Sequence, residues 1–354
     1  MKKLIFLLFC LITVHSFAQK NEDVLVEPQP HLLKQYHPNV SSSGKKTVYT
    51  IVKKQGFNSI NDTMQVDFYN EQGFKVKTVR YENNQPESSL EFRYDENGNE
   101  VETKYEKRSL QNVTSFTEST YNSQNRLIQI QSKTQRLNDI TISNTKKYNY
   151  KDDQLIEKKI YQGKNNSQID SFFYHNKLLT HHKLIYTQAI YAFENNYAYN
   201  HTGQLILKET RNLIKDKSTK ELSGKTEYTY EKGNLVAVIE LEGKNLTNQE
   251  PVRTFYSYDA DDQLSKMRVE YKSFYRDVKY EYEDAKISSI QVISNSDNNA
   301  YLKFWVATFG NMISEFPFQY EEKFTYDDKA NLISKKILLK DELIREIVYD
   351  IEYY

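Results

Sequence analysis

A short aromatic phrase recurs about ten times along this chain and limits what it can fold into. A typical copy has an aromatic residue, any residue, a tyrosine, a polar turn and then Leu, Ile or Val. Its second aromatic position is occupied by Tyr69, Tyr94, Tyr121, Tyr150, Tyr174, Tyr199, Tyr230, Tyr258, Tyr282 and Tyr326. Most steps between these tyrosines span 24 to 31 residues, and the last spans 44. Because a recurring phrase means that one supersecondary unit is stacked many times, the pattern predicts a repeat architecture.

The residues that follow each tyrosine predict a hairpin turn. In several copies the fourth residue after the tyrosine can adopt a positive φ. These residues are Gly73, Gly98, Asn125, Gly203 and Asp262. Asp95, Asn122 and Asp259 come directly after the tyrosine and can accept hydrogen bonds from their own turn backbone. A four- or five-residue loop built on a type I turn fits this pattern, and Tyr174 to Leu178 fits a two-residue turn.

Each repeat is therefore predicted to be one β-hairpin. The two aromatic residues of a phrase stand at i and i+2, so they point to the same face of the sheet. We expect stacked hairpins to form a ladder of Tyr and Phe rings, with the hydroxyl groups in water. The predicted fold is all-β: about ten antiparallel hairpins over residues 46–354, forming an elongated, curved or spiralling single sheet with open end strands.

The best copies of the phrase resemble the YD repeat of the rearrangement-hotspot and teneurin-like proteins. Phe92-Arg93-Tyr94-Asp95 followed by Gly98 carries the resemblance most fully, and Tyr256–Asp259 and Phe324–Asp327 follow. In that family the hairpins wind into a wide sheet, sometimes closed around a toxin. Here the period is longer and less regular, and we find no self-cleaving core motif or toxin domain. The resemblance thus implies a fold and no activity, and about ten repeats are expected to be too few to close a shell.

The N-terminus predicts export. Lys2 and Lys3 precede an apolar run from Leu4 to Val14, so residues 1–18 read as a signal peptide and residues 19–45 as a linker or cap. The only cysteine, Cys10, lies in this signal, which leaves a lipoprotein reading as a less favoured alternative. The end of the signal and the Asn/Lys/Tyr-rich composition resemble secreted proteins of the Bacteroidetes. The expected location is the periplasm, the cell surface or the medium.

Charge and composition argue against several classes of partner. The 48 basic and 48 acidic side chains cancel, whereas a nucleic-acid binder needs excess positive charge. The signal is too short for a membrane helix, and strands such as residues 157–159 are charged on both parities, unlike a lipid-facing barrel. The mature chain shows no converging metal ligands, phosphate loop or nucleophile motif, so we expect no cofactor, no metal and no catalytic residue.

The long last step contains the strongest candidate site. Residues 296–322 interrupt the repeats and contain the only tryptophan. A binding platform there would use Trp305, Phe304, Phe309, Phe316 and Phe318. The alternatives are a degenerate repeat that buries Trp305 or a cap over the last hairpins. Separately, Asp62-Thr63-Met64 resembles the O-glycosylation site of Bacteroidetes proteins, which makes Thr63 a candidate for modification.

Three functional hypotheses follow from the sequence. The first is a non-catalytic secreted or envelope repeat protein that binds or scaffolds an unknown glycan or protein partner. The second is a carbohydrate-active or peptide-processing enzyme with its site near Trp305. The third is a toxin-free relative of polymorphic-toxin YD-repeat proteins. The oligomeric state is open.

Overall fold

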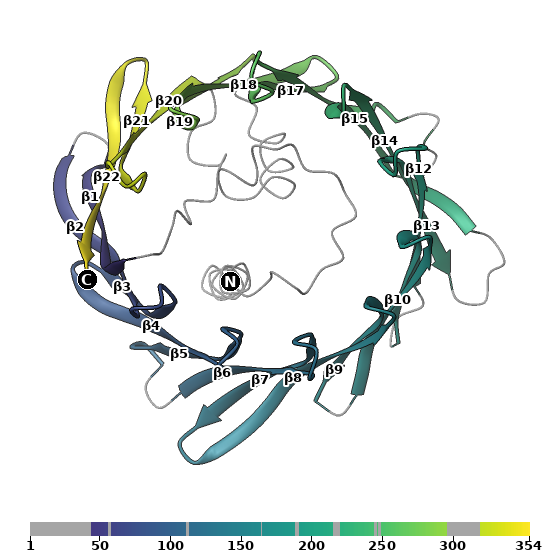
Figure 1. Cartoon of the computed structure of the whole chain (residues 1–354), viewed down its shortest axis with the longest axis horizontal. Helices are drawn as coiled ribbons and strands as arrows, with labels where there is room; N and C mark the ends of the chain where they lie inside the picture. The colour runs from purple at the N-terminus through teal and green to yellow at the C-terminus, as the bar shows by residue number, and fades with distance from the viewer. Residues whose placement is uncertain are drawn as a thin grey trace.

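The computed structural model describes residues 44–354 apart from 56–57, 111–112, 164, 188–190, 215–219, 244–245, 247–248 and 296–318. The described residues form 22 β-strands, and each strand pairs antiparallel with the next (Figure 1). The strands are β1 (Lys45–Gln55), β2 (Asn58–Tyr69), β3 (Lys75–Glu82), β4 (Gln85–Tyr94), β5 (Glu100–Lys107), β6 (Val113–Tyr121), β7 (Leu127–Arg136), β8 (Asp139–Lys151), β9 (Gln154–Gln162), β10 (Asn165–His175), β11 (Leu178–Tyr186), β12 (Tyr191–Tyr199), β13 (Leu205–Ile214), β14 (Lys220–Glu231), β15 (Asn234–Glu242), β16 (Val252–Tyr258), β17 (Leu264–Tyr271), β18 (Phe274–Glu283), β19 (Lys286–Ser294), β20 (Gln319–Tyr326), β21 (Leu332–Leu339) and β22 (Glu342–Tyr353).

The predicted turns are confirmed. Gly98 has a φ of 78° and Asp262 a φ of 58°, as the phrase requires. In the turn after Tyr94, the Gly98 amide donates to the Asp95 carbonyl at 3.1 Å, which closes a type I turn. The Asp95 Oδ1 accepts hydrogen bonds from the Asn97 and Asn99 amides, both at 2.9 Å. The same side-chain caps occur at Asn122 and Asp259.

A register shift follows each turn at the same place. The shift lies beside the second tyrosine of the phrase, as between Thr229 and Tyr230, where Tyr230 pairs with Leu235 and Thr229 with Ala237. The strand after the turn therefore contains one extra residue, which is a β-bulge. A bulge bends its strand and increases the local twist, so its repetition gives the whole sheet a consistent curvature.

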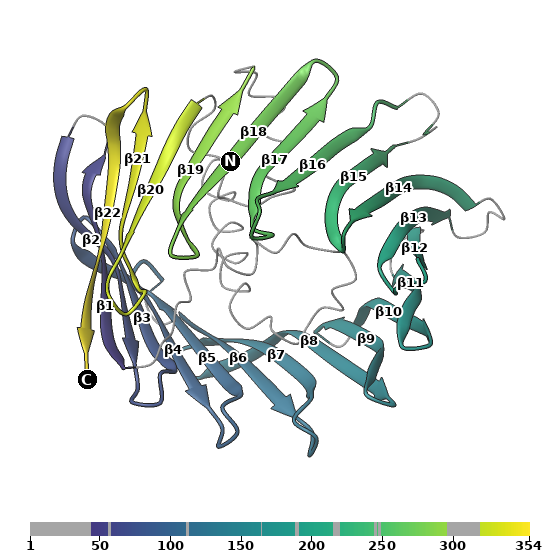
Figure 2. The same cartoon turned by 45° about the horizontal axis from the view of Figure 1, so that its top comes forward.

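That curvature closes the sheet into a barrel, because β22 pairs antiparallel with β1 from Tyr353 opposite Lys45 to Arg345 opposite Gln55. Figures 1 and 2 show the resulting ring of inclined strands. The expectation of an open, elongated or spiralling sheet of ten hairpins with free end strands is wrong. Joining the two end strands removes both unpaired edges, which an open sheet would leave exposed to water or to other chains. Because the 22 strands are about 4.8 Å apart and inclined, the barrel is more than about 34 Å across, wider than side chains from opposite walls can span.

The seam between β22 and β1 repeats the geometry of a turn without a covalent turn. In a regular copy, Tyr94 pairs with Glu100 and the Asp95 amide donates to the Asn99 carbonyl at 2.9 Å. At the seam, Tyr353 pairs with Lys45 and the Tyr354 amide donates to the Gly44 carbonyl, also at 2.9 Å. Ten phrases thus join even-numbered strands to the next strand, and the two end strands complete an eleventh unit.

Most of the buried apolar side chains form three clusters along the wall. The largest spans β16 to β21 and contains Leu264, Val269, Phe274, Val278 and Tyr320. A second cluster lies on β7 to β9 around Leu127 and Tyr148, and a third on β13 to β15 around Leu205 and Leu235. The tyrosines of the phrase pack against all three clusters. The tyrosines of the repeated phrase therefore contribute to the core of the wall in successive hairpins.

Candidate functional site

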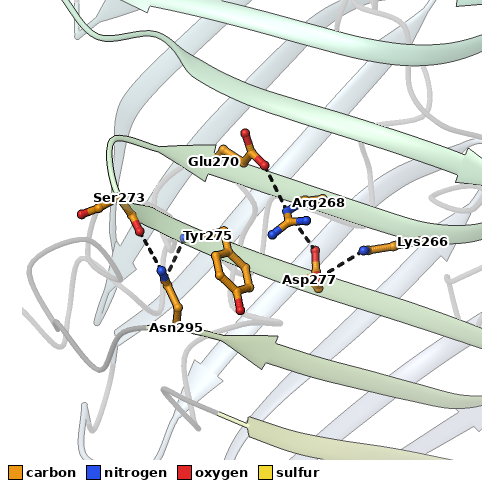
Figure 3. Close-up of polar contacts among 7 residues, drawn as sticks. All are labelled: Lys266, Arg268, Glu270, Ser273, Tyr275, Asp277 and Asn295. Carbon is orange, nitrogen blue, oxygen red and sulfur yellow. Dashed lines mark hydrogen bonds and ion pairs between the residues drawn. The ribbon is translucent and has the colours of Figure 1, made fainter.

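The two faces of the barrel wall differ in chemistry. On β18, Phe274, Arg276 and Val278 are buried, while Lys279 and Glu281 on the other parity are exposed. Figure 3 views the β17–β18 hairpin with Arg268, Glu270 and Asp277 in front of the near wall and the opposite wall behind them. These charged side chains therefore lie on the outer face. The buried parity, which contains Tyr280 and Tyr282, faces the inside of the barrel.

The predicted ladder of aromatic rings lies on this inner face. Tyr228 and Tyr230 share one parity of β14 with the buried cluster, whereas Glu227 and Glu231 lie exposed on the other. On β10, Phe172 faces inward and stacks on His182 with ring centroids 4.7 Å apart. Its neighbour Phe173 faces outward and is 51% exposed. The same-face prediction for the phrase is confirmed.

The hydroxyl of the second tyrosine has a specific acceptor instead of water. In eight copies it donates to a backbone carbonyl at 2.7 to 3.1 Å. The donors are Tyr94, Tyr121, Tyr174, Tyr199, Tyr230, Tyr258, Tyr282 and Tyr326, and the acceptors are Lys75, Glu100, Leu155, Leu179, Leu205, Leu235, Leu264 and Ile287. Each acceptor pairs across the ladder with the second tyrosine of the preceding hairpin, as Leu235 does with Tyr230. Every such hydroxyl therefore links its own hairpin to the one before it.

Burial raises the pKa of tyrosine hydroxyl groups on the inner face. Loss of solvent, and then the nearby Asp259 carboxylate, raise the pKa of Tyr282 to about 12. Burial is also the largest cause that raises the pKa of Tyr94, Tyr256 and Tyr280. The hydroxyl groups therefore stay protonated, and can donate hydrogen bonds, to higher pH than the hydroxyl of an exposed tyrosine.

Arg276 is one of two buried cations among the described residues, and Lys45 is the other. The Arg276 side chain is 2% exposed and sits on β18 between Phe274 and Val278. Burial lowers the pKa of Arg276, and the Tyr320 hydroxyl beside it opposes that change. Its guanidinium nitrogens have no well-aligned hydrogen-bond partner among the described residues. Sequence reasoning missed this residue, although an arginine in the parity of Phe274, Val278 and Tyr280 was the available signal.

Other inner-wall charges have partners. Glu322 is buried and pairs with Lys335 at 2.9 Å. Asp170 is buried and lies 2.9 Å from the His182 Nε2. Pairing offsets the cost of removing these carboxylates from water, so we interpret them as structural residues of the wall.

The outer face carries a polar network on β17 and β18 (Figure 3). The Arg268 Nε lies 3.1 Å from Glu270 and 3.5 Å from Asp277, and the guanidinium stacks over the Tyr275 ring at 4.5 Å. Lys266 pairs with Asp277 at 3.2 Å. These alternating charges hold the strands in register and leave the outer surface of this hairpin polar.

The side-chain amide of Asn295 forms two hydrogen bonds at the end of the same hairpin. The Asn295 Oδ1 accepts a hydrogen bond from the Tyr275 amide at 2.8 Å, and its Nδ2 donates to the Ser273 carbonyl at 2.6 Å (Figure 3). Asn295 lies just beyond β19, so it continues the pairing of β18 after the regular ladder has ended.

The predicted binding residues lie elsewhere. Trp305, Phe304, Phe309, Phe316 and Phe318 all lie outside the described residues, as do the signal peptide and most of the linker. Thr63 lies on β2 at a register shift, is half-buried, and its amide donates to the Asn84 Oδ1 at 2.9 Å. Its modification stays a prediction. Within the described residues, no group of three His, Cys, Asp or Glu side chains could hold a metal ion.

No protein-family model matches the chain, and neither does any curated protein sequence. Among solved structures, the Tc toxin complex TcdB2–TccC3 aligns with 81% of this chain at 13% identity and a TM-score of 0.38. The alignment covers 15% of that toxin chain, so this chain spans a small part of it. A porin-like protein from Bacteroides uniformis aligns with 75% of this chain, and with 95% of its own length, at 9% identity and a TM-score of 0.30. Similarity this low does not define a family. In the described part of the chain, no helix is long and apolar enough to cross a membrane.

Proposed function

We propose that this chain is a non-catalytic, exported barrel that binds an extended glycan or polypeptide against its aromatic inner wall. The observation that carries the proposal is the placement of the repeated aromatic residues on the inside of a closed ring. Aromatic faces bind sugar rings and apolar peptide side chains by stacking, and neutral hydroxyl edges add polar contacts without a charge penalty. A ring of repeats suits a ligand that is itself a polymer.

The outer wall supports a barrel surrounded by water in the periplasm, at the cell surface or in the medium. The outer parity of β17 and β18 contains Lys266, Arg268, Glu270, Asp277 and Lys279, whereas a lipid-facing wall needs an apolar band. This arrangement also gives no support for nucleic acid as a partner, because both signs of charge alternate along it. A membrane-spanning role is accordingly no part of the proposal.

Two alternative functions have less support from the described residues. The enzyme hypothesis places the active site near Trp305, in a segment outside the described residues, and no described group of side chains favours it. A toxin-free relative of YD-repeat shell proteins would use the same inner wall to hold a polypeptide, so it differs in the ligand and not in the site.

Neighbouring phenylalanines of β10 provide a matched test. Phe172→Leu removes an inward ring, and Phe173→Leu removes an outward ring from the next position of the same strand. Purified residues 19–354 would be screened on glycan and peptide arrays, and the affinity for the best hit measured for both variants. We expect Phe172→Leu to weaken binding about fivefold, as the loss of one aromatic contact does, and Phe173→Leu to leave it unchanged.

Thermal midpoints of both variants, measured without ligand, separate lost binding from lost folding. Absence of any ligand on both arrays, or loss of affinity with Phe173→Leu alone, would count against the inner wall as the site. Measurable turnover of an array hit would favour the enzyme instead.

A further inference from the structure

One hairpin exposes both apolar side chains and an unpaired strand edge. The tip of the β7–β8 hairpin projects outward from the wall (Figure 1). Its apolar residues Leu137, Ile140 and Ile142 are 72%, 62% and 42% exposed. β9 begins to pair with β8 only at Asn144, so residues 139–142 have β7 on one side and no strand on the other.

The free backbone groups of this edge can be identified from the turn. Arg136 and Asp139 flank a two-residue turn and pair with each other, and such a flanking pair exchanges hydrogen bonds. The pairs then alternate, so Thr141 bonds to β7 while Ile140 and Ile142 direct their amides and carbonyls to the open side. The edge therefore offers two donors and two acceptors from the same residues that expose apolar side chains.

Two of the usual protections of an exposed edge, lysine and proline, are missing here. Residues 139–142 contain no lysine and no proline, and they are rich in β-branched side chains. Leu137, at the turn, has a φ of 53°, a conformation that glycine adopts without strain and leucine does not. A strained and exposed leucine next to an unprotected edge is expected where a surface makes a contact.

We propose that this edge pairs antiparallel with the same edge of a second copy of the chain. The segment Asp139-Ile140-Thr141-Ile142-Ser143 is nearly palindromic around Thr141. A two-fold axis at Thr141 places Ile140 opposite Ile142 of the second copy, and all four isoleucines on one face, where β-branched pairs stabilise a sheet. The only charge, Asp139, then faces Ser143 and not another carboxylate.

The geometry permits this contact and limits its strength. A register shift between Ser132 and Lys133, with Ser143 as the extra residue of β8, bends the tip relative to the wall. The bend and the outward projection let two tips lie side by side while the barrels stay apart. Five residues from each copy bury much less than the area of a stable dimer, so the association is weak and depends on protein concentration.

Sedimentation of purified residues 19–354 over a concentration series tests the proposal. We expect a monomer–dimer equilibrium that Ile140→Lys weakens at least tenfold, because each substitution occurs twice in a two-fold contact. Ile140→Pro should have the same effect, since it removes an amide that points to the open edge and not to β7. Ile156→Lys, at a 37% exposed isoleucine of β9, a strand that lies between β8 and β10, should leave the equilibrium unchanged.

A cysteine at the two-fold axis gives an independent readout. Thr141 would meet its copy in a non-hydrogen-bonded pair with Cα atoms about 4.5 Å apart, which lies within the range of a disulfide. Residues 19–354 contain no other cysteine. Under mild oxidation Thr141→Cys should cross-link to a dimer faster than Ser257→Cys, at an exposed position next to the last residue of β16.

A protein that stays monomeric at every concentration, with equal cross-linking of the two cysteine variants, would overturn the proposal. So would a dimer that persists in both Ile140 variants. Binding of a foreign extended peptide at this edge by a monomeric protein would overturn self-association and assign the edge to another partner.

Discussion

The hydroxyl group of the second tyrosine explains why the phrase needs tyrosine and not phenylalanine. In Tyr258 it donates to the Leu235 carbonyl at 2.8 Å, beside the bulge at which the ladder of the preceding hairpin is interrupted. The ring fills the inner core, and the hydroxyl satisfies a carbonyl that no ladder partner shares at that point. The sequence predicts the face on which the ring lies, because parity is local. It does not predict the acceptor, which belongs to a residue 18 to 39 positions earlier.

Tyr258→Phe should lower the free energy of unfolding by about 1 kcal/mol, because it removes one hydrogen bond and leaves a part-buried carbonyl unsatisfied. Tyr256→Phe on the same strand is the control, since the Tyr256 hydroxyl donates no hydrogen bond in the described contacts. Urea denaturation of both variants measures the difference. Equal stability of the two variants would show that the hydroxyl contributes nothing to the link between hairpins.

Arg276 marks the limit of residue-level reasoning. Alternation on β18 shows that it shares a face with Phe274 and Val278, yet nothing in the sequence indicates whether a carboxylate lies opposite. Only the structure shows that Glu322 and Asp170 have partners of opposite charge, whereas Arg276 has none among the described residues. The sequence alone also does not show whether Thr63 is modified, because the motif that suggests it is only three residues long.

The hairpin is the element that the sequence describes best. Turn type, positive φ and side-chain caps depend on five or six consecutive residues, so Asp95, Asn97 and Gly98 are enough to specify them. Hairpin length is less well specified. β8 extends past β9, which stops at Gln162, and that difference in length creates the free edge.

Two glycines at equivalent turn positions should respond differently to alanine. Gly98 and Gly203 have φ values of 78° and 81°, so a Cβ costs each about 1 kcal/mol from backbone strain alone. At Gly98 the added Cβ would also lie 2.8 Å from the Phe74 ring, which stacks on Tyr94, whereas nothing lies within 4 Å at Gly203. Gly98→Ala should therefore lose more stability than Gly203→Ala, measured as shifts in the urea midpoint. A smaller loss at Gly98 would mean that Phe74 moves at no cost.

At the scale of the molecule, closure converts a repeat into a barrel. Each hairpin adds the same bulge and bend, and after 22 strands the accumulated rotation brings Tyr353 beside Lys45. An array of fewer repeats, or one with less bend per repeat, would stay open. The number of phrases can be counted in the sequence, but the bend per phrase cannot, and the expectation of an open sheet failed for that reason.

The many shielded tyrosines should make the barrel sensitive to alkali. Thirteen described tyrosines have a raised pKa, with burial as the largest cause in each, and Tyr282 titrates only near pH 12. The folded chain therefore binds more protons than the unfolded chain above the ordinary tyrosine pKa of 10, so stability falls as pH rises beyond it. Lys45 and Arg276, whose pKa values are lowered by burial, oppose this trend as two groups among the described residues.

The measurement is urea unfolding on both sides of pH 10, together with the tyrosinate absorbance of the folded protein. We expect the absorbance to rise at higher pH in the folded protein than in urea. Stability that is unchanged above pH 10 would mean that the hydroxyl groups ionise as readily in the wall as in the unfolded chain.

The sequence by itself determined the strands, their turns and the face on which the aromatic rings lie. These features depend on φ preferences and on period-two alternation, both of which neighbouring residues carry. The tertiary structure alone decided that β1 and β22 meet and which carbonyl each tyrosine binds. It also decided that Arg276 is buried with no carboxylate partner among the described residues, and that residues 139–142 keep a free edge. Those features depend on twist and bend summed over the whole ring and on contacts between residues far apart in the chain, which no local pattern encodes.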